Sequence, residues 1–460
     1  MTFSKIEKKT FLIISMLIVF SFIALYFGLL VHTSIIRADQ WRFIDLYIYP
    51  IVKNTFDLSL LWNDHHPQPL TAILFIWSKK YFDLTINMYF YVGIIGKILF
   101  ISFFTYLLNK STQMSVIKTL IILLVISTFL SLKSFNEYGW PLVTLSNIWL
   151  FILLVLFFYI DKLYKNFNIS DYLIVYILIT FLLIMVKDTA IIYIASLFSI
   201  LLLISLIDKQ YNKIISYILV LTMSFTTFKL FFFLIEVQED FSNKLLFNLE
   251  TFNILGACNS YAIALLSGLL KVESLKEIDL SEYTILTIAY LVTFLYLLTI
   301  IYYVKNKIYK VTLVPLSFMI GTLTFITAVV MYRFYPDSNA IQWAVVSPRY
   351  TKIYEVGIIS MFWSLLLISN KKIFSNLQKK IFIIIILIIV IMNIYYIFSA
   401  FHFSKYLINS NIKSEKALQD YSKNREDTIP KYIRGSYFSD DKVDFLKRNH
   451  LNVFSKKYEK

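Results

Sequence analysis

Long hydrophobic runs alternate with short polar connections along almost the whole chain of 460 residues. Each run has about 17–25 mainly apolar residues, the length that an α-helix needs to cross the hydrocarbon core of a bilayer. Eleven ranges are predicted as membrane-spanning helices: 11–31, 86–108, 115–133, 141–160, 170–186, 189–207, 214–235, 284–304, 311–332, 352–369 and 381–400. The pattern therefore predicts an all-α polytopic membrane protein with about eleven transmembrane helices.

Lysine residues mark every second connection between these ranges. These connections contain Lys110, then Lys162 and Lys165, then Lys209 and Lys213, then Lys305, Lys307 and Lys310, and finally Lys371, Lys372, Lys379 and Lys380. Cytoplasmic connections of membrane proteins are enriched in Lys and Arg. The alternation therefore predicts a multi-pass protein whose N-terminus, with Lys5, Lys8 and Lys9, is cytoplasmic. No small-residue cleavage site follows the first run, so we expect that run to be an uncleaved helix.

The remaining polar regions are then predicted to lie outside the cytoplasm. They are a first external loop at 32–85, a turn at 134–140, stretches at 236–283 and 333–350, and a tail from 401. Within them, the segments 69–84 and 254–270 are apolar but too short or too polar to span a bilayer. We expect both to form amphipathic interfacial or re-entrant helices, with Trp77 and Tyr81 at the level of the headgroups.

The composition changes sharply near residue 400. A transmembrane domain is predicted at 1–400 and a small extracytoplasmic tail at 401–460, where charges of both signs are mixed. Residues 439–454 resemble a short helix followed by an apolar end, with Ser439 as the N-cap. Acidic residues in the first turn and basic residues in the last turn would favour this helix. The tail is interpreted as an appendage packed on the membrane domain, and disorder is the alternative.

The composition agrees with a membrane protein and excludes other classes. The chain is 58% hydrophobic and only 16% charged, whereas soluble domains are nearer half apolar and a quarter charged. Its formal net charge of +15 comes from lysines between the hydrophobic runs, and no base-reading motif accompanies them, so a nucleic-acid partner is not expected. The single cysteine, Cys258, excludes an internal disulfide and a cysteine metal cluster.

Asp39 is the first candidate for chemistry, because it follows the first helix directly at the outer membrane surface. A carboxylate there can accept a proton from an attacking hydroxyl group. The alternative is an interfacial ion pair with Arg37 or Arg42. Asp45 lies six residues further on, which turns it away from Asp39 on a helix, so we expect it to face solvent or to support the site indirectly.

The second candidate is the sequence Asn63-Asp64-His65-His66 near the end of the first external loop. Imidazole and carboxylate groups are competent ligands for a divalent metal. Neighbouring side chains diverge, however, so two adjacent histidines rarely bind one ion. Hydrogen bonding of Asp64, His65 and His66 to phosphate or sugar hydroxyls is the alternative, and the metal requirement stays open.

Further candidates lie in the later outer regions. Glu137 is an acidic group at the bilayer edge, where a charge is costly unless it is paired, and a cap near Lys133 is the alternative. Arg333 and Arg349 could bind a lipid phosphate through their planar guanidinium groups, or simply contact headgroups. Tyr350 follows Arg349 in the sequence. Three tryptophans could stack on sugar rings, although interfacial anchoring explains them equally well: Trp41, Trp62 and Trp140.

The order of these motifs resembles the GT-C superfamily of membrane glycosyltransferases, and especially a bacterial branch of it. The matching motifs are Asp39-Gln40-Trp41, Asn63-Asp64-His65-His66, Asn136-Glu137-Tyr138-Gly139-Trp140, and Arg349-Tyr350 preceded by Ser347. The resemblance covers most of residues 1–400, through short motifs. Gln40 stands where the family often has a second acid, His66 replaces an arginine, and Pro348 interrupts the Ser-Arg-Tyr string.

This resemblance implies an inverting transferase in the bacterial cytoplasmic membrane, with its active site on the extracytoplasmic face. The donor would be a polyprenyl-phosphate-linked sugar, and the acceptor a surface glycan, lipid or protein. Asp39 would be the general base, and Arg349, with Arg333, His66 or a divalent cation, would balance the charge of the leaving phosphate. Two alternatives are a transporter or flippase for lipid-linked sugars and a polysaccharide polymerase or ligase. A transporter should place charges within its spans, whereas here nearly all lie in the connections.

Overall fold

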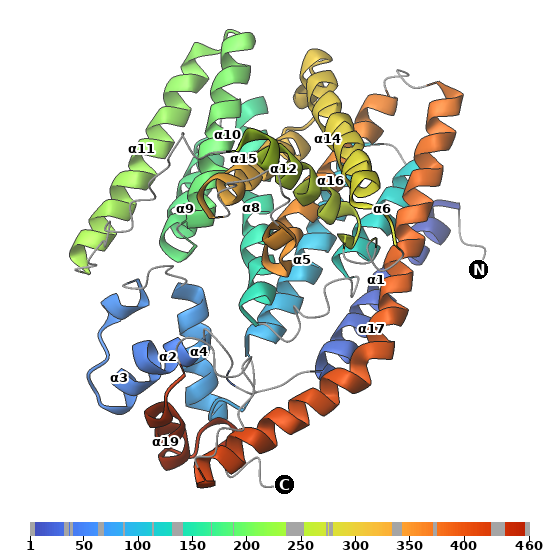
Figure 1. Cartoon of the computed structure of the whole chain (residues 1–460). Helices are drawn as coiled ribbons and strands as arrows, with labels where there is room; N and C mark the ends of the chain where they lie inside the picture. Colours follow the sequence, from blue (N-terminus) through green and yellow to red (C-terminus); the bar gives the residue numbers. More distant parts are fainter. Residues whose placement is uncertain are drawn as a thin grey trace.

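The computed structural model is built of helices, and among the residues that it describes there is no strand (Figure 1). These residues are 5–31, 36, 40–62, 69–85, 88–112, 115–130, 141–166, 168–186, 188–235, 253–272, 275, 279–333, 343–370, 375–424 and 438–455. A helix forms at each of the eleven predicted ranges: α1 Lys5–Val31, α5 Met88–Ser111, α6 Val116–Phe129, α8 Pro141–Lys165, α9 Ile169–Met185, α10 Asp188–Ile207, α11 Tyr211–Leu234, α14 Glu282–Lys305, α15 Val314–Ala328, α16 Pro348–Asn370 and α17 Asn376–Asn424.

Eight of these helices are long and apolar enough to cross a membrane: α5, α8, α10, α11, α14, α15, α16 and α17. The peripheral helices α11 and α14 expose large apolar side chains, such as Phe233 and Phe294, as helices facing lipid do. The chain is therefore an all-α, multi-pass membrane protein. The helices α1, α6 and α9 are shorter within the described residues, so a total of eleven membrane crossings stays a prediction.

Short helices form at both segments that were too short to span. Helix α4 (Pro69–Phe82) carries exposed Trp77 and Tyr81, and helix α12 (Ile254–Leu269) packs between α14 and α16. Their predicted places at the membrane interface stay predictions. Helix α17 runs without a break through residue 400, where the sequence predicts the domain boundary, and extends far beyond the bundle (Figure 1). The division into two domains also stays a prediction.

Helices α12, α15 and α16 approach one another through glycine. A Cβ atom added to Gly268 would lie 2.7 Å from the backbone carbonyl carbon of Tyr354, and one added to Gly357 would lie 2.6 Å from Oγ1 of Thr322. Small residues at such crossings let helix backbones come close, which is how membrane helices gain packing energy without a hydrophobic driving force. The close packing of α12, α15 and α16 therefore depends on glycine, which has no side chain, at these two positions.

Replacing Gly268 by Leu is expected to destabilise the protein by at least about 1–3 kcal/mol, the usual cost of an overpacked core. The new side chain would meet the backbone of Tyr354, which cannot move without shifting α16. The check is the thermal unfolding midpoint in nanodiscs, with Leu255→Phe as the control, since Leu255 lies on an exposed face of the same helix. Equal midpoints for both variants would contradict this close crossing.

At one end of the bundle, three of the lysine-rich connections meet at the carboxylate of Asp208. Tyr164, at the end of α8, donates a hydrogen bond to Asp208 Oδ2 at 2.6 Å. Tyr309, after α14, donates to Oδ1 at 3.2 Å, and the Nζ atom of Lys310 lies 3.4 Å from Oδ2. These contacts agree with the prediction that alternate connections share one face. Which face of the membrane this is stays a prediction.

Asp208 is expected to stabilise this end of the bundle only when it is ionised. Burial opposes the charged form, but the hydrogen bonds from Tyr164 and Tyr309 and the charge of Lys310 outweigh it, so the pKa of Asp208 lies below its ordinary value. A group whose pKa is lowered in the folded state stabilises the protein at pH values above its pKa in the unfolded state. This stabilisation is lost as the pH falls through the pKa of the folded state.

Asp208→Asn should therefore cost about 1.5–3 kcal/mol at pH 7, the range for hydrogen bonds to a charged group. The difference in unfolding midpoint between wild type and variant should shrink below about pH 4. Melting curves of both proteins across this pH range provide the measurement. A difference that does not change with pH would show that the charge is not responsible.

Candidate functional site

The described residues of 40–85, called the first external loop after their predicted position, form short helices at the opposite end of the bundle from Asp208 (Figure 1, lower left). Its elements are α2 Gln40–Phe43, η1 Ile44–Ile48, α3 Tyr49–Val52, η2 Leu58–Leu61 and α4. Its core is apolar: Tyr47 is almost fully buried, and burial raises the pKa of Tyr47 to about 12, so its hydroxyl group is neutral at physiological pH. The loop is thus a packed unit of the structure.

Two of the tryptophans predicted to stack on sugar rings are packed inside this part of the structure. Trp41 is fully buried, and its ring meets Phe438 of the C-terminal segment edge-on, with centroids 5.1 Å apart. Trp62 is also buried, donates from Nε1 to the carbonyl of Ile184 at 2.9 Å, and contacts Phe231. In this arrangement both residues hold elements together, and their predicted contact with sugar stays a prediction.

Two segments that contain candidate site residues, or residues close to them in the sequence, form a π-helix. The first is η1, which contains Asp45, and the second is η4 (Val329–Arg333), which extends α15 and ends at Arg333. π-Helical turns are rare and are found frequently at functional sites, because they change the direction in which side chains point. Both lie at the end of the bundle opposite Asp208.

The sequence Ser347-Pro348-Arg349-Tyr350 opens helix α16. Pro348 occupies its first position, where a proline is favoured because its missing N–H has no intrahelical partner there. The carbonyl of Ser347 accepts a hydrogen bond from the Tyr350 N–H at 2.9 Å. Arg349 is therefore the second residue of a helix, in a region that favours anions through the helix dipole. The Tyr350 side chain is buried and its ring packs near Phe325, with centroids 6.1 Å apart.

A buried ion pair that the sequence analysis missed lies one turn further along α16. The Nζ atom of Lys352 is 2.9 Å from Glu355 Oε2, and the two side chains are 1% and 0% exposed. The signal was present: two opposite charges three residues apart inside a predicted span, the spacing that brings side chains together on a helix. Ionisable groups inside a membrane are costly and commonly mark functional sites.

Lys97 on α5 is another buried charged residue, with an exposed fraction of 0%. Further along, Phe104 of α5 contacts Trp363 of α16, with ring centroids 4.9 Å apart. Lys97 lies seven residues before Phe104 on α5, and Glu355 lies eight residues before Trp363 on α16. The bundle thus contains buried charged groups on two helices.

Most of the predicted site lies outside the described residues. This holds for Asp39, Asp64, His65, His66, Glu137 and Trp140, and for the side chains of Arg333 and Arg349. Within the described part of the chain, no group of three or more His, Cys, Asp or Glu residues could bind a metal ion. The described residues around the predicted site are Gln40, Trp41, Trp62, Ser347 and Tyr350. Their positions are the structural basis for the proposal below.

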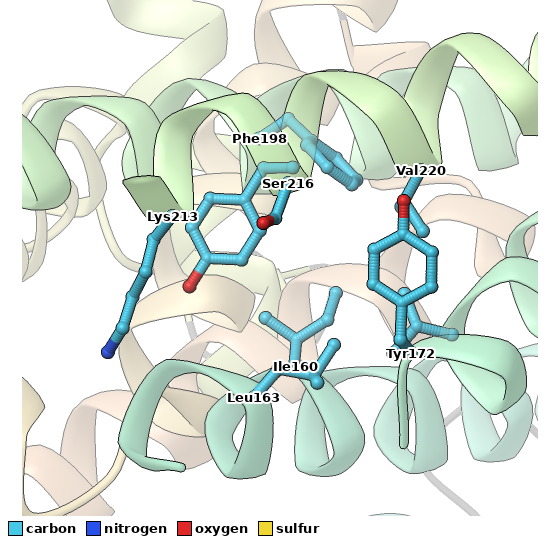
Figure 2. A pocket seen from close by; sticks show the side chains of 9 residues that line it. Ile160, Leu163, Tyr172, Phe198, Lys213, Ser216 and Val220 are labelled. Atoms are coloured by element: carbon cyan, nitrogen blue, oxygen red, sulfur yellow. The ribbon is translucent and has the colours of Figure 1, made fainter. Parts of the chain in front are cut away.

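A hollow with room for about one water molecule lies elsewhere, between α8, α9, α10 and α11 (Figure 2). Phe198, Leu163 and Val220 make it mainly apolar, and Lys213 lies at one side of it. It is near the Asp208 end of the bundle, because Lys213 donates a hydrogen bond to the carbonyl of Tyr164. The hollow is therefore separate from the predicted site.

Comparisons of the chain with protein-family models, with curated proteins and with solved structures gave no match. The class of protein therefore follows from the fold alone: a helical, multi-pass protein of the lipid bilayer.

Proposed function

We propose that the protein is an inverting membrane glycosyltransferase that moves a sugar from a polyprenyl-phosphate donor to a surface glycan, lipid or protein. The proposal includes eleven membrane crossings, a cytoplasmic N-terminus and a site on the extracytoplasmic face of a bacterial cytoplasmic membrane. It rests on the motif resemblance described above, and one structural observation supports it.

This observation is that separate segments carrying the motifs belong to the same end of the bundle. The first loop reaches the end of α9 through the hydrogen bond from Trp62 to Ile184. Helix α16 begins beside the end of α15, where Tyr350 packs on Phe325. Both contacts lie at the C-terminal ends of α9 and α15, and the N-terminal ends of these helices are the ones near Asp208. A donor whose phosphate lies at the membrane surface could therefore contact residues from both segments.

In the proposed reaction, Asp39 removes the proton from an acceptor hydroxyl group, whose oxygen attacks the anomeric carbon of the sugar. The bond from that carbon to the phosphate oxygen breaks, and the polyprenyl phosphate leaves with the electron pair. Arg349 at the start of α16, together with Arg333, His66 or a divalent cation, balances the phosphate charge. Asp64, His65 and Glu137 contact the sugar or phosphate, and one displacement at one face gives inversion.

The experiment uses the purified protein in nanodiscs with polyprenyl-phosphate sugars that carry a labelled sugar, and a panel of glycan, lipid and peptide acceptors. The expected result is labelled acceptor in amounts that match the released polyprenyl phosphate. No labelled acceptor with any donor, although the protein is folded, would contradict the proposal. Products that grow into long chains would favour a polymerase instead.

Transport of lipid-linked sugars is the second candidate, and one observation favours it. The pair Lys352–Glu355 and the buried Lys97 place charges inside spans, as a transporter requires. Proteoliposomes with donor in one leaflet separate the two functions. Donor that crosses the bilayer with its sugar still attached would indicate a transporter.

A further inference from the structure

The C-terminal segment 438–455, called the C-terminal clamp below, packs on the first external loop (Figure 1, α19 beside α2 and α3). It contains α19 (Asp440–Arg448) and η6 (Asn452–Phe454). A helix after Ser439 agrees with the sequence, although the Ser439 side chain makes no capping hydrogen bond. What the sequence could not indicate is the surface on which this helix packs.

The clamp contacts the first half of the loop through a charge pair and a ring pair. The Nζ atom of Lys442 lies 2.6 Å from Asp45 Oδ2, and the Lys442 side chain is only 11% exposed. Three residues further along α19, the ring of Phe445 lies 5.2 Å from that of Tyr49. Asp45 and Tyr49 lie in one continuous helical stretch, residues 40–52, whose middle part is the π-helix η1. A helix this short is marginal in isolation, so tertiary contacts must stabilise its conformation.

The clamp contacts the other end of the loop through Asn452. The Asn452 N–H donates to the carbonyl of Asp83 at 2.7 Å, and its side-chain amide donates to the carbonyl of Leu84 at 2.9 Å. Asp83 and Leu84 both have left-handed backbones, with φ of 51° and 61°. This conformation is unfavourable for leucine and persists only where the surroundings enforce it. Asn452 is fully buried and binds the two carbonyls of this strained turn.

The clamp is in turn attached to the extended part of α17. Tyr421 donates a hydrogen bond to Asp440 at 2.5 Å, and Gln419 donates to the carbonyl of Val453 at 3.1 Å. The ring of Phe438 lies between Trp41 and Tyr421, at 5.1 and 5.8 Å. A rigid helix thus connects through the clamp to Trp41, which follows Asp39 by two positions in the chain.

We propose that the C-terminal clamp is a positioning element, in which Lys442 and Asn452 hold the first external loop in the conformation that glycosyl transfer requires. The proposal rests on the proposed function, because the segment held in place begins one residue after Asp39. Lys442 and Asn452 act through the loop and contact neither donor nor acceptor.

The first test measures the loop without any reaction. Hydrogen exchange of residues 40–52 and 83–85 is followed in nanodiscs for wild type, Lys442→Met and Asn452→Ala. Exchange should rise about tenfold for Asn452→Ala, which loses a buried hydrogen bond, and less for Lys442→Met, whose partner Asp45 is 57% exposed. Arg448→Met is the control, since Arg448 is exposed and its Nε atom donates to the carbonyl of Asp444 on the same helix. Unchanged exchange in both variants would overturn the proposal.

The second test measures transfer by the same proteins. Asn452→Ala should lower kcat about tenfold with little change in KM for the donor, and Arg448→Met should leave both near wild type. Two rescues exclude general misfolding. Asp83→Gly removes left-handed strain from the same turn without taking a side chain out of the apolar core, and it should restore part of the rate of Asn452→Ala. The exchanged pair Asp45→Lys with Lys442→Asp should be faster than either single change.

The outcomes separate the two proposals. Faster exchange with an unchanged transfer rate would reject the positioning role and leave the glycosyltransferase function intact. Faster exchange in a protein that transfers no sugar even as wild type would reject the proposed function, and with it the catalytic part of the clamp's role. Failure of both rescues would show that the variants act through loss of folding, which also overturns the proposal.

Discussion

Replacing Asp39 by Asn is expected to lower glycosyl transfer by about 10²–10⁴-fold, the usual contribution of a positioned general base. The amide has nearly the shape of the carboxylate but cannot accept the proton of the acceptor hydroxyl group. The loss should appear in kcat, because the donor is bound chiefly through its phosphate and sugar. Initial rates with a labelled donor provide the measurement, and the unfolding midpoint shows that the variant is folded.

Asp57→Asn is the matched control in the same loop. Asp57 precedes η2 and accepts a hydrogen bond from the Ser59 N–H at 2.7 Å. Hydrogen bonds from the side chain and backbone of Ser59 hold the pKa of Asp57 below its ordinary value. This carboxylate therefore has a local capping role, and we expect its replacement to leave transfer near wild type. Equal rates for Asp39→Asn and wild type would remove Asp39 from the mechanism.

Replacing Glu355 by Leu is expected to destabilise the protein by about 3–5 kcal/mol, the cost of breaking a buried ion pair. The change removes the carboxylate 2.9 Å from Lys352 and leaves the ammonium charge of Lys352 inside the bundle. The double variant Lys352→Met with Glu355→Leu should recover most of this loss, because two apolar side chains then replace the pair. Unfolding midpoints of the two single variants and the double variant complete the cycle.

The pair Lys162–Asp171, whose lysine is exposed, provides the comparison for this cycle. Its atoms are 3.4 Å apart, but the Lys162 side chain is 42% exposed, so Asp171→Asn should cost less than about 1 kcal/mol. If the changes at Lys352 and Glu355 are simply additive, the two groups do not act as a pair. If the double variant is stable but transports or transfers no sugar, the pair has a functional role beyond stability.

The helices could be predicted from the sequence because the length and hydrophobicity of a run are local properties. Each of the eleven predicted ranges contains a helix, and the prediction of a polytopic all-α membrane protein is confirmed by eight helices that can cross a bilayer. The lysine alternation predicts that alternate connections lie on one side of the membrane, and the contacts of Lys310 and Tyr309 with Asp208 agree with this. Both patterns reflect the bilayer, which acts on each segment separately.

The buried charges show where local patterns fail. The predicted span 352–369 contains Lys352 and Glu355, but a hydropathy pattern does not tell whether a polar residue faces lipid, water or another helix. The structure buries both by packing α12 and α15 against α16 at Gly268 and Gly357. Partners for a buried charge come from this packing, so they cannot be assigned from one segment alone.

The sequence by itself determined the class of protein, the position of its helices and the short helix after Ser439. Only the tertiary structure decided that this helix packs on the first external loop, through Lys442 on Asp45 and Asn452 on Leu84. Asn452 and Leu84 are 368 positions apart in the chain. Hydrophobic runs and helix caps depend on neighbouring residues, whereas a contact between distant segments depends on how all the helices between them pack.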